Sequence, residues 1–305
     1  MIADRDCPLL HQGCSAKLGI TVERCGVMQK SAGKLWVVAT PIGNLEDLSA
    51  RAQSILRQVD LVAAEDTRHS AALLQHYGIS ARRVALHEHN EREASGELVQ
   101  RLLEGAQIAL ISDAGTPLVS DPGFRLVRAA RAAGIAVSPV PGACAAIAAL
   151  SVAGLPSDRF VFEGFLPPKS AARRTLLQAM VNESRTLMFY ESSHRIVETI
   201  DDMADVFGTG RAAVIARELT KLFETVLDGT LGDLAGRIKS DPNQQRGEFV
   251  VLVAGAGEDA EAARLAQGRR VFDLLRTELA PGRAAKLAAE ITGAPRNALY
   301  RVEQD

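Results

Sequence analysis

Aromatic residues are scarce in this 305-residue chain, at 4% of the sequence, although 47% of its residues are hydrophobic. A core built from Ala, Val, Leu and Ile suits strands covered by helices on both faces better than a β-sandwich or a barrel. The chain is also too long for one average domain. The composition therefore predicts an α/β protein of two or three domains.

Cysteine is equally scarce, and the spacings match no zinc pattern: the four cysteines are Cys7, Cys14, Cys25 and Cys144. No other group of His, Cys and carboxylate residues has metal-ligand spacing, so we expect no metal. The N-terminus is acidic and lacks the apolar core and cleavage site of a secretory signal. These features predict a reducing, cytoplasmic compartment.

Charge of one sign is not in excess, because the formal net charge is −2. This balance neither supports nor excludes RNA as a partner. One uncharged stretch, residues 132–157, is long enough to span a bilayer, but prolines and glycines interrupt it, among them Pro139, Pro141, Pro156, Gly134 and Gly142. We expect a soluble protein with neither a membrane nor DNA as a partner.

Periodicity begins at Leu35. Residues 1–33 show none and are expected to be a disordered extension, with Met28 an alternative start. Beyond it, apolar runs alternate with helical patterns, which predicts βαβ units and a parallel sheet in a domain over 34–154. The expected strands are 35–38, 61–64, 108–111 and 135–140, and the expected helices are 48–58, 69–77, 92–104 and 123–133.

A second α/β domain is predicted over 155–256, with strands at 159–163, 186–190, 212–216 and 249–253. Two such domains imply a cleft between them, where small molecules often bind. Residues 260–305 form the tail, and from Arg264 to Arg301 it carries eight basic residues against three acidic ones. A helix over 283–292, a turn at Gly293 and a new start at Pro295 predict a helix-turn-helix-like RNA-binding domain. The alternative is a helical tail that packs on the body.

Four polar or glycine-rich loops follow the four strands of the first domain, including "SDAGTPLVSDPG" after 108–111. Ligands bind at the carboxyl ends of parallel strands, so we expect a binding site along these loops. The dinucleotide fingerprint G-x-G-x-x-G and the P-loop are both absent. Loops that offer mostly backbone groups suit a zwitterionic, adenine-containing ligand better than a triphosphate.

Several motifs occur in one order along the chain: "VVATPIGNLEDL", "AAEDTRHSAALL", "HEHNE", "ISDAGTPLVSDPG", "PVPGACAAIAAL", "FEGFLPPK", "FYESSHRI" and "ARELTK". This set resembles the family of ribosomal RNA small subunit methyltransferase I, within the class III, tetrapyrrole-methylase-like methyltransferases. The resemblance implies a homodimer that uses S-adenosylmethionine to methylate the ribose 2′-hydroxyl of a cytidine in 16S rRNA near the decoding centre. It also implies that the cofactor lies between the two α/β domains.

The same resemblance implies which residues contact the cofactor: Pro41, Asp113, Gly115, Thr116, Ala143, Cys144, Tyr190, Ala216 and Gly247. Three positions depart from the family pattern. Cys144 replaces a serine, Ser193 replaces a proline, and Phe223 stands where histidine is common. A hydroxyl contact would be weakened at Cys144, and a catalytic role is not expected at Phe223.

A carboxylate or histidine could accept the proton of a ribose hydroxyl. The candidates are Glu65 and Asp66 after the second strand, and Glu88 and Asn90 in "HEHNE". Asp66 could instead cap the following helix. Glu88 and Asn90 would face the same side only if their segment is extended.

Basic residues near strand ends and in the tail predict contacts with RNA phosphates. The alternative is a solvated charged face. The predicted contacts are Arg68, Lys169, Arg173, Arg174, Arg195, Arg217, Lys221, Arg283, Lys286 and Arg296.

Two other functions stay open on the sequence. One is a methyltransferase acting on a corrin or porphyrin precursor, and the other is a non-catalytic RNA-binding protein of ribosome assembly. The "AEDTR" and "ELTK" motifs and the basic tail favour the RNA enzyme over the first, and the complete set of loops argues against the second.

Overall fold

The computed structural model describes residues 33–299, without the side chains of 258–261 and 263. The expected extension therefore lies outside the described residues, apart from residue 33. Within the described part, no helix is both long enough and apolar enough to cross a membrane.

The first sheet has the strand order β3-β2-β4-β1-β5, and every neighbouring pair is parallel. This confirms the expected parallel sheet. Its strands are β1 Lys34–Val38, β2 Leu61–Ala64, β3 Arg83–Ala85, β4 Gln107–Ile111 and β5 Ala136–Val140. The sequence did not predict β3, a three-residue edge strand without a fully buried residue.

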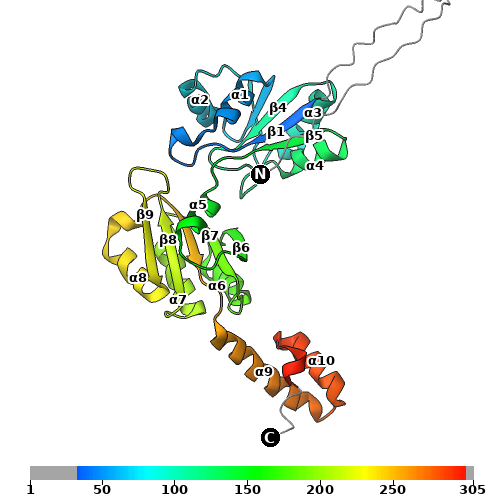
Figure 1. Cartoon of the computed structure of the whole chain (residues 1–305), viewed down its shortest axis with the longest axis vertical. Helices are drawn as coiled ribbons and strands as arrows, with labels where there is room; N and C mark the ends of the chain where they lie inside the picture. The colour runs from blue at the N-terminus through cyan, green and yellow to red at the C-terminus, as the bar shows by residue number, and fades with distance from the viewer. Residues whose placement is uncertain (1–32, 300–305) are drawn as a thin grey trace, which may run out of the picture. The chain divides into compact units, whose positions relative to one another are not determined.

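Helices cover both faces of this sheet (Figure 1). One face packs on α1 (Ala50–Gln58) and α2 (Thr67–His76), and the other packs on α3 (Glu91–Leu103) and α4 (Phe124–Ala132). Side-chain caps fix two of the starts, because Ser49 accepts a hydrogen bond from the Ala52 N–H and Asp66 accepts one from the Arg68 N–H. The single-turn helix η1 (Leu45–Asp47) precedes α1.

The second sheet has the order β6-β7-β10-β8-β9 and is mixed. Only β6 and β7 are parallel, and the other three pairs are antiparallel. Its strands are β6 Phe160–Phe165, β7 Thr186–Ser192, β8 Ala212–Arg217, β9 Thr225–Thr230 and β10 Glu248–Val253. The sequence missed β9, which has no fully buried residue and no continuous apolar run.

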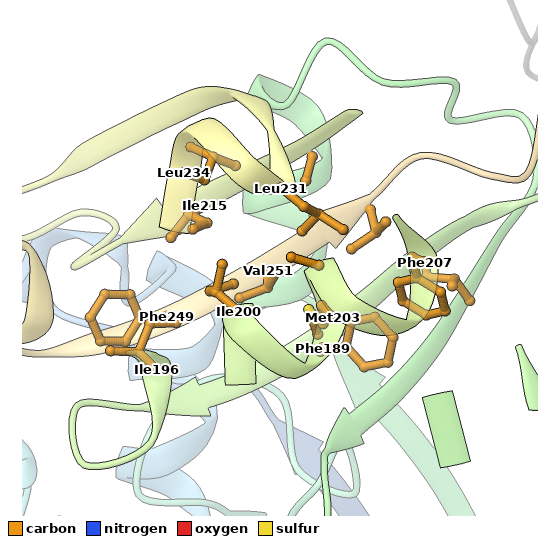
Figure 2. Close-up of a cluster of buried hydrophobic side chains, with 14 of the residues drawn as sticks. Phe189, Ile196, Ile200, Met203, Phe207, Ile215, Leu231, Leu234, Phe249 and Val251 are labelled. Carbon is orange, nitrogen blue, oxygen red and sulfur yellow. The ribbon is translucent and has the colours of Figure 1, made fainter. Parts of the chain in front are cut away.

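The two faces of the second sheet have different partners. One face packs on α6 (Ser170–Ala179), α7 (Ile196–Phe207) and α8 (Leu231–Ser240), around Phe189, Met203 and Val251 (Figure 2). The other face meets α5 (Ala145–Val152) and Ile42, which follows β1. The single-turn helix η2 (Pro242–Gln245) precedes β10. Residues of the first sheet's loops and α5 therefore lie against the second sheet.

The tail folds into α9 (Glu258–Arg276), α10 (Pro281–Thr292) and α11 (Arg296–Leu299). Pro281 stands in the first turn of α10, and Gly293 ends that helix in the left-handed conformation, at φ +70°. The three helices enclose a core of their own, which includes Phe272, Ala285 and Leu299. The expected helix, turn and restart are confirmed, while the predicted domain boundaries stay predictions.

Candidate active site

Hydrogen bonds tie the loops at the carboxyl end of the first sheet to one another. Thr40 after β1 exchanges two backbone hydrogen bonds with Gly115 after β4, at 2.8 and 3.0 Å, and its hydroxyl donates to the Ser112 carbonyl at 3.2 Å. The Thr116 hydroxyl donates to the Ala143 carbonyl after β5 at 3.0 Å. Three loops therefore form one connected rim.

Gly115 has the left-handed φ of +84°, and a Cβ there would lie 3.3 Å from the Ile42 side chain. The position therefore favours glycine for its conformation and for the space beside Ile42. A ligand can approach the backbone closely at such a position.

Asp113 joins the loop after β2 to this rim. Its Oδ1 accepts a hydrogen bond from the Asp66 N–H at 3.0 Å, which fixes the orientation of the carboxylate. The side chain of Asp66 accepts from the Arg68 N–H at 2.7 Å and so caps α2.

A pocket of about 360 Å³ opens between this rim and the second sheet. Its volume lies within the range of roughly 300 to 1,000 Å³ that is usual for small-molecule sites. The residues that line it are Ile42, Glu65, Asp113, Ala114, Gly115, Thr116, Val119, Ser120, Asp121, Ala145, Phe165, Tyr190, Glu191, Ser192, Ala216, Leu219, Lys221, Glu248, Phe249 and Val250.

Carboxylates dominate the polar lining of the pocket. Burial, together with the charges of Glu65 and Asp113, raises the pKa of Asp121 to about 6, although a hydrogen bond with Ser112 opposes the rise. Burial and the Asp113 charge also raise the pKa of Glu65. Lys221 is the one cation among the described lining residues. The pocket is therefore electrostatically suited to a ligand with positive charge.

Tyr190 anchors α5 to the second sheet. Its hydroxyl accepts a hydrogen bond from the Ala146 N–H at 3.2 Å, in the first turn of α5. Its ring contacts Phe162 and Phe165 edge-on, with centroids 4.9 and 5.6 Å apart. Burial raises the pKa of the phenol, so Tyr190 stays neutral at physiological pH.

Five of the nine residues expected to contact the cofactor line the pocket: Asp113, Gly115, Thr116, Tyr190 and Ala216. The other four, Pro41, Ala143, Cys144 and Gly247, are outside the lining. Pro41 stands between Thr40 and the lining residue Ile42, and Ala143 accepts the Thr116 hydroxyl. Cys144 stands at the N-cap of α5 without a side-chain capping bond, so its replacement of serine removes a common cap. Their roles toward the cofactor stay predictions.

Among the four catalytic candidates, Glu65 alone lines the pocket. The premise that "HEHNE" is extended is wrong, because residues 88–90 form a turn that the Asn90 N–H closes on the His87 carbonyl. The Asn90 side chain accepts from the His87 N–H at 2.8 Å and donates to the Ala85 carbonyl at 3.0 Å. Glu88 is exposed, and Asp66 is a helix cap. The Asn90 side chain is therefore engaged in hydrogen bonds within the turn. Because the segment is not extended, the expectation that Glu88 and Asn90 face the same side no longer has a basis.

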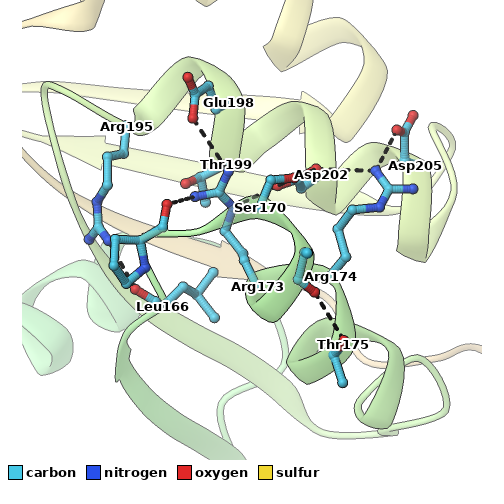
Figure 3. A network of polar contacts seen from close by, with 12 residues as sticks. Leu166, Ser170, Arg173, Arg174, Thr175, Arg195, Glu198, Thr199, Asp202 and Asp205 are labelled. Carbon is cyan, nitrogen blue, oxygen red and sulfur yellow. Dashed lines mark hydrogen bonds and ion pairs between the residues drawn. The ribbon is translucent and has the colours of Figure 1, made fainter.

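Arg173 is fully buried, so the structure contradicts its assignment as a phosphate contact. Its guanidinium lies 2.7 Å from Asp202 and 3.6 Å from Glu198 (Figure 3). Asp202 also accepts from Ser170 and from Arg174, whose second partner is Asp205. Arg173 holds α6 to α7.

Two further arginines from the RNA set bond within the protein. Arg195 lies 2.8 Å from the buried Glu191. Its guanidinium also donates to the Leu166 carbonyl (Figure 3). Arg217 is buried and donates to two backbone carbonyls, those of Arg246 and Phe223. Both side chains therefore hold the loops next to the ends of strands in the second sheet.

The remaining predicted RNA contacts lie at or near the surface. Lys221 lines the pocket, Arg174 is partly exposed, and Arg68 is mostly exposed at the start of α2. The other exposed members of the set are Lys169, Arg283, Lys286 and Arg296. These positions stay predictions.

Sequence reasoning missed Asp121, Glu248 and Phe165 as lining residues. Asp121 falls in the "SDAGTPLVSDPG" loop that the sequence did single out, but only its first half was assigned. Two residues of this loop, Leu118 and Ser120, have left-handed φ values of +74° and +66°. Leucine and serine rarely adopt this conformation, so the backbone course of the loop, and with it the position of Asp121, could not be predicted from the sequence.

Comparisons with known proteins identify the class. Residues 34–235 match the family described as Tetrapyrrole (Corrin/Porphyrin) Methylases, and residues 261–302 match the RsmI C-terminal HTH domain. Among solved structures, diphthine synthase superposes with a TM-score of 0.56 at 16% identity, covering 88% of this chain and 100% of the other. The methyltransferase CobJ superposes with a TM-score of 0.55 at 19% identity, covering 73% and 95%. These superpositions show the fold.

Curated relatives of high sequence identity indicate the group within this class. Ribosomal RNA small subunit methyltransferase I of Xylella fastidiosa is 61% identical over 268 residues, covering 88% of this chain and 98% of that protein. The proteins of the same name from Pseudomonas aeruginosa and Escherichia coli O157:H7 are 61% and 53% identical, covering 89% of this chain and 96% and 94% of theirs. The chain belongs to the tetrapyrrole methylase family, in its ribosomal RNA small subunit methyltransferase I group, and is a methyltransferase.

Proposed function

We propose that the pocket binds S-adenosylmethionine and that the protein transfers its methyl group to the ribose 2′-hydroxyl of cytidine 1402 in 16S rRNA. One observation carries the proposal: the chain that forms this carboxylate-lined pocket also has a tail matching the RsmI C-terminal HTH domain. The names of the relatives at 53–61% identity support small-subunit rRNA as the substrate.

The residues present fit this cofactor. Gly115 lacks a side chain where the rim faces the pocket, so the backbone can approach a nucleoside. The carboxylates of Glu65, Asp113 and Asp121 suit a ligand with a sulfonium and an ammonium group. Tyr190 and Phe165 give the pocket an aromatic wall. We propose that these residues hold the cofactor, together with the predicted contacts at Pro41, Thr116, Ala143, Cys144, Ala216 and Gly247.

The bound cofactor supplies a methyl group that is already activated for transfer. The protein chiefly has to align the ribose oxygen with it, and such positioning is worth roughly 7 to 11 kcal/mol in the best intramolecular models. Glu65 accepts a hydrogen bond from the ribose hydroxyl and orients it. As a general base, Glu65 contributes roughly 100-fold or more to the rate. Because its pKa is raised, it accepts a proton more readily than an ordinary carboxylate.

RNA reaches the pocket from the side where Lys221 lies, and the exposed cations Arg68, Lys169 and Arg174 contact its backbone. The tail contributes Arg283, Lys286 and Arg296, which are exposed on α10 and α11. The protein works as a homodimer in the cytoplasm on the 30S subunit.

The test measures incorporation of labelled methyl groups into 30S particles that lack their own 2′-O-methylcytidines. Primer extension at low dNTP then maps the modified nucleotide. We expect a 2′-O-methylated cytidine at 1402, and a loss of at least tenfold in the Glu65→Gln variant at saturating S-adenosylmethionine. Cofactor binding without incorporation would favour the tetrapyrrole precursor as substrate. RNA binding without cofactor binding would favour the assembly protein.

A further inference from the structure

The loop after β8, residues 218–224, has a constrained backbone. Glu218 and Thr220 have left-handed φ values of +49° and +66°, although neither is glycine. Hydrogen bonds hold both residues: the Glu218 N–H donates to the Glu248 carbonyl at 2.9 Å, and the Thr220 N–H donates to the Glu224 carboxylate at 2.6 Å. The loop therefore presents its side chains in fixed directions.

Lys221 is held by two carboxylates. Its Nζ lies 2.8 Å from Glu218 Oε1 and 2.9 Å from Glu248 Oε2. Glu218 Oε1 also accepts the Glu248 N–H at 2.9 Å, so this carboxylate is itself fixed to β10. Burial opposes the charge of Lys221, but the ion pairs outweigh it and raise the pKa. The ammonium is thus kept charged at the wall of the pocket.

Two glycines provide space for this arrangement. A Cβ at Gly247 would lie 2.5 Å from the Glu218 carboxylate, and a Cβ at Gly43 would lie 2.4 Å from Cγ of Lys221. Gly247, expected from the sequence to contact the cofactor, therefore has a second role, and Gly43 is the glycine of the loop after β1. Both loops leave space that Glu218 and Lys221 fill.

An ammonium group has three N–H donors, and the two carboxylates engage two of them. We propose that Glu218 is a positioning residue that directs the third N–H of Lys221 to a sugar–phosphate oxygen of the nucleotide being methylated. This inference rests on the proposed function and adds to it a residue that the sequence did not single out. Glu248 contributes less, because its side chain is 76% exposed.

A double-mutant cycle tests this role with the full-length protein and the 30S substrate. Lys221→Met raises KM for 30S particles about tenfold and changes kcat less than threefold. The reason is that the lost contact stabilises the bound substrate and the transition state to the same extent. Glu218→Gln raises KM to a similar extent, while Glu248→Gln raises it about twofold. In the Lys221→Met background, Glu218→Gln adds nothing, since it acts only through Lys221.

Two controls separate positioning from folding. Lys239→Met removes a surface lysine that pairs with Asp201, and its KM stays that of the wild type. The affinity for S-adenosylmethionine, measured by calorimetry, stays within twofold in all variants. If the KM of the double variant rises by the product of the two single effects, Glu218 acts independently of Lys221 and the proposal is overturned. In that case, methylation of 30S particles by the wild type would still support the proposed function. If the wild type methylates no RNA, both fall together.

Discussion

Two clusters in the second half of the molecule each pair a cation with two carboxylates, but the two cations differ in exposure. Arg173 on α6 contacts the carboxylates of Asp202 and Glu198, and Lys221 after β8 contacts those of Glu218 and Glu248. The Arg173 side chain is 0% exposed, whereas Lys221 is 28% exposed and lines the pocket. One cation between two carboxylates therefore holds helices together when sealed from solvent, and faces a ligand when one side is open.

The largest effect is expected on stability at Arg173. Arg173→Met leaves Asp202 buried without its main partner, and breaking a buried pair costs about 3 to 5 kcal/mol of unfolding free energy. Lys221→Met lowers this free energy by less than about 1.5 kcal/mol, because Lys221 is itself partly exposed and Glu248 is 76% exposed, so solvent screens the ion pairs. Urea denaturation of both variants measures the difference. Equal stabilities would remove the distinction between the clusters.

Asp121 sharpens the comparison, because the charged groups that raise its pKa are the carboxylates of Glu65 and Asp113. Its folded-state pKa of about 6 lies above the unfolded value of 3.8, so the folded protein loses stability as pH rises through 6. The rise of the pKa from 3.8 to about 6 corresponds to about 3 kcal/mol, and solvent screening of this partly exposed carboxylate lowers the effect, so Asp121→Asn is about 2 kcal/mol more stable than the wild type at pH 8. The gap closes below pH 4, where both states of the wild type are protonated.

Denaturant unfolding of Asp121→Asn and the wild type from pH 4 to 8 gives this dependence. Asp228→Asn, in the exposed β9 strand, is the matched control, and its stability difference from the wild type stays small across the range. A gap for Asp121→Asn that is independent of pH would show that its carboxylate is not destabilised by burial.

The smallest effect is expected at Arg174, beside Arg173 in sequence. Its side chain is 42% exposed and pairs with Asp205, which is 63% exposed, at 2.7 Å. Its second partner, the buried Asp202, lies 3.1 Å away and keeps Arg173 at 2.7 Å when Arg174 is removed. Exposed ion pairs contribute about 0 to 1 kcal/mol, so Arg174→Ala lowers the unfolding free energy by less than about 1 kcal/mol. Thermal unfolding next to Arg173→Met tests this, and a loss of 3 kcal/mol would place Arg174 in the buried network.

The sequence predicted the elements that bury continuous apolar runs. The strand 61–64 has the bounds of β2, whose four residues are all buried, and the helix and turn around Gly293 are where the residue types placed them. Short or half-exposed strands such as β3 and β9 lack that signal. The hydrogen bonds of the Asn90 side chain accompany a turn at residues 88–90, although the residue types of this segment also fit a strand.

Residue patterns alone predicted the candidate site where its residues follow strands, whereas Tyr190 and Ala216, which lie within β7 and β8, were expected only from the family resemblance. Glu65, Asp113 and Gly115 each stand shortly after a buried strand, and all three line the pocket. The burial of Arg173 depends on Asp202, 29 residues away, so no local pattern reveals it. Lys221 and Glu218 share one motif, but their pairing with Glu248 requires the antiparallel contact between β8 and β10.

The central claim is that the pocket at the carboxyl end of the first sheet is where methyl transfer to rRNA occurs. The most direct measurement is methyl incorporation into 30S particles by folded Asp113→Ala, with Lys239→Met as a control whose ion pair with Asp201 lies outside the pocket. The account predicts a loss of at least 100-fold for Asp113→Ala and wild-type incorporation for Lys239→Met. Full incorporation by folded Asp113→Ala would contradict it.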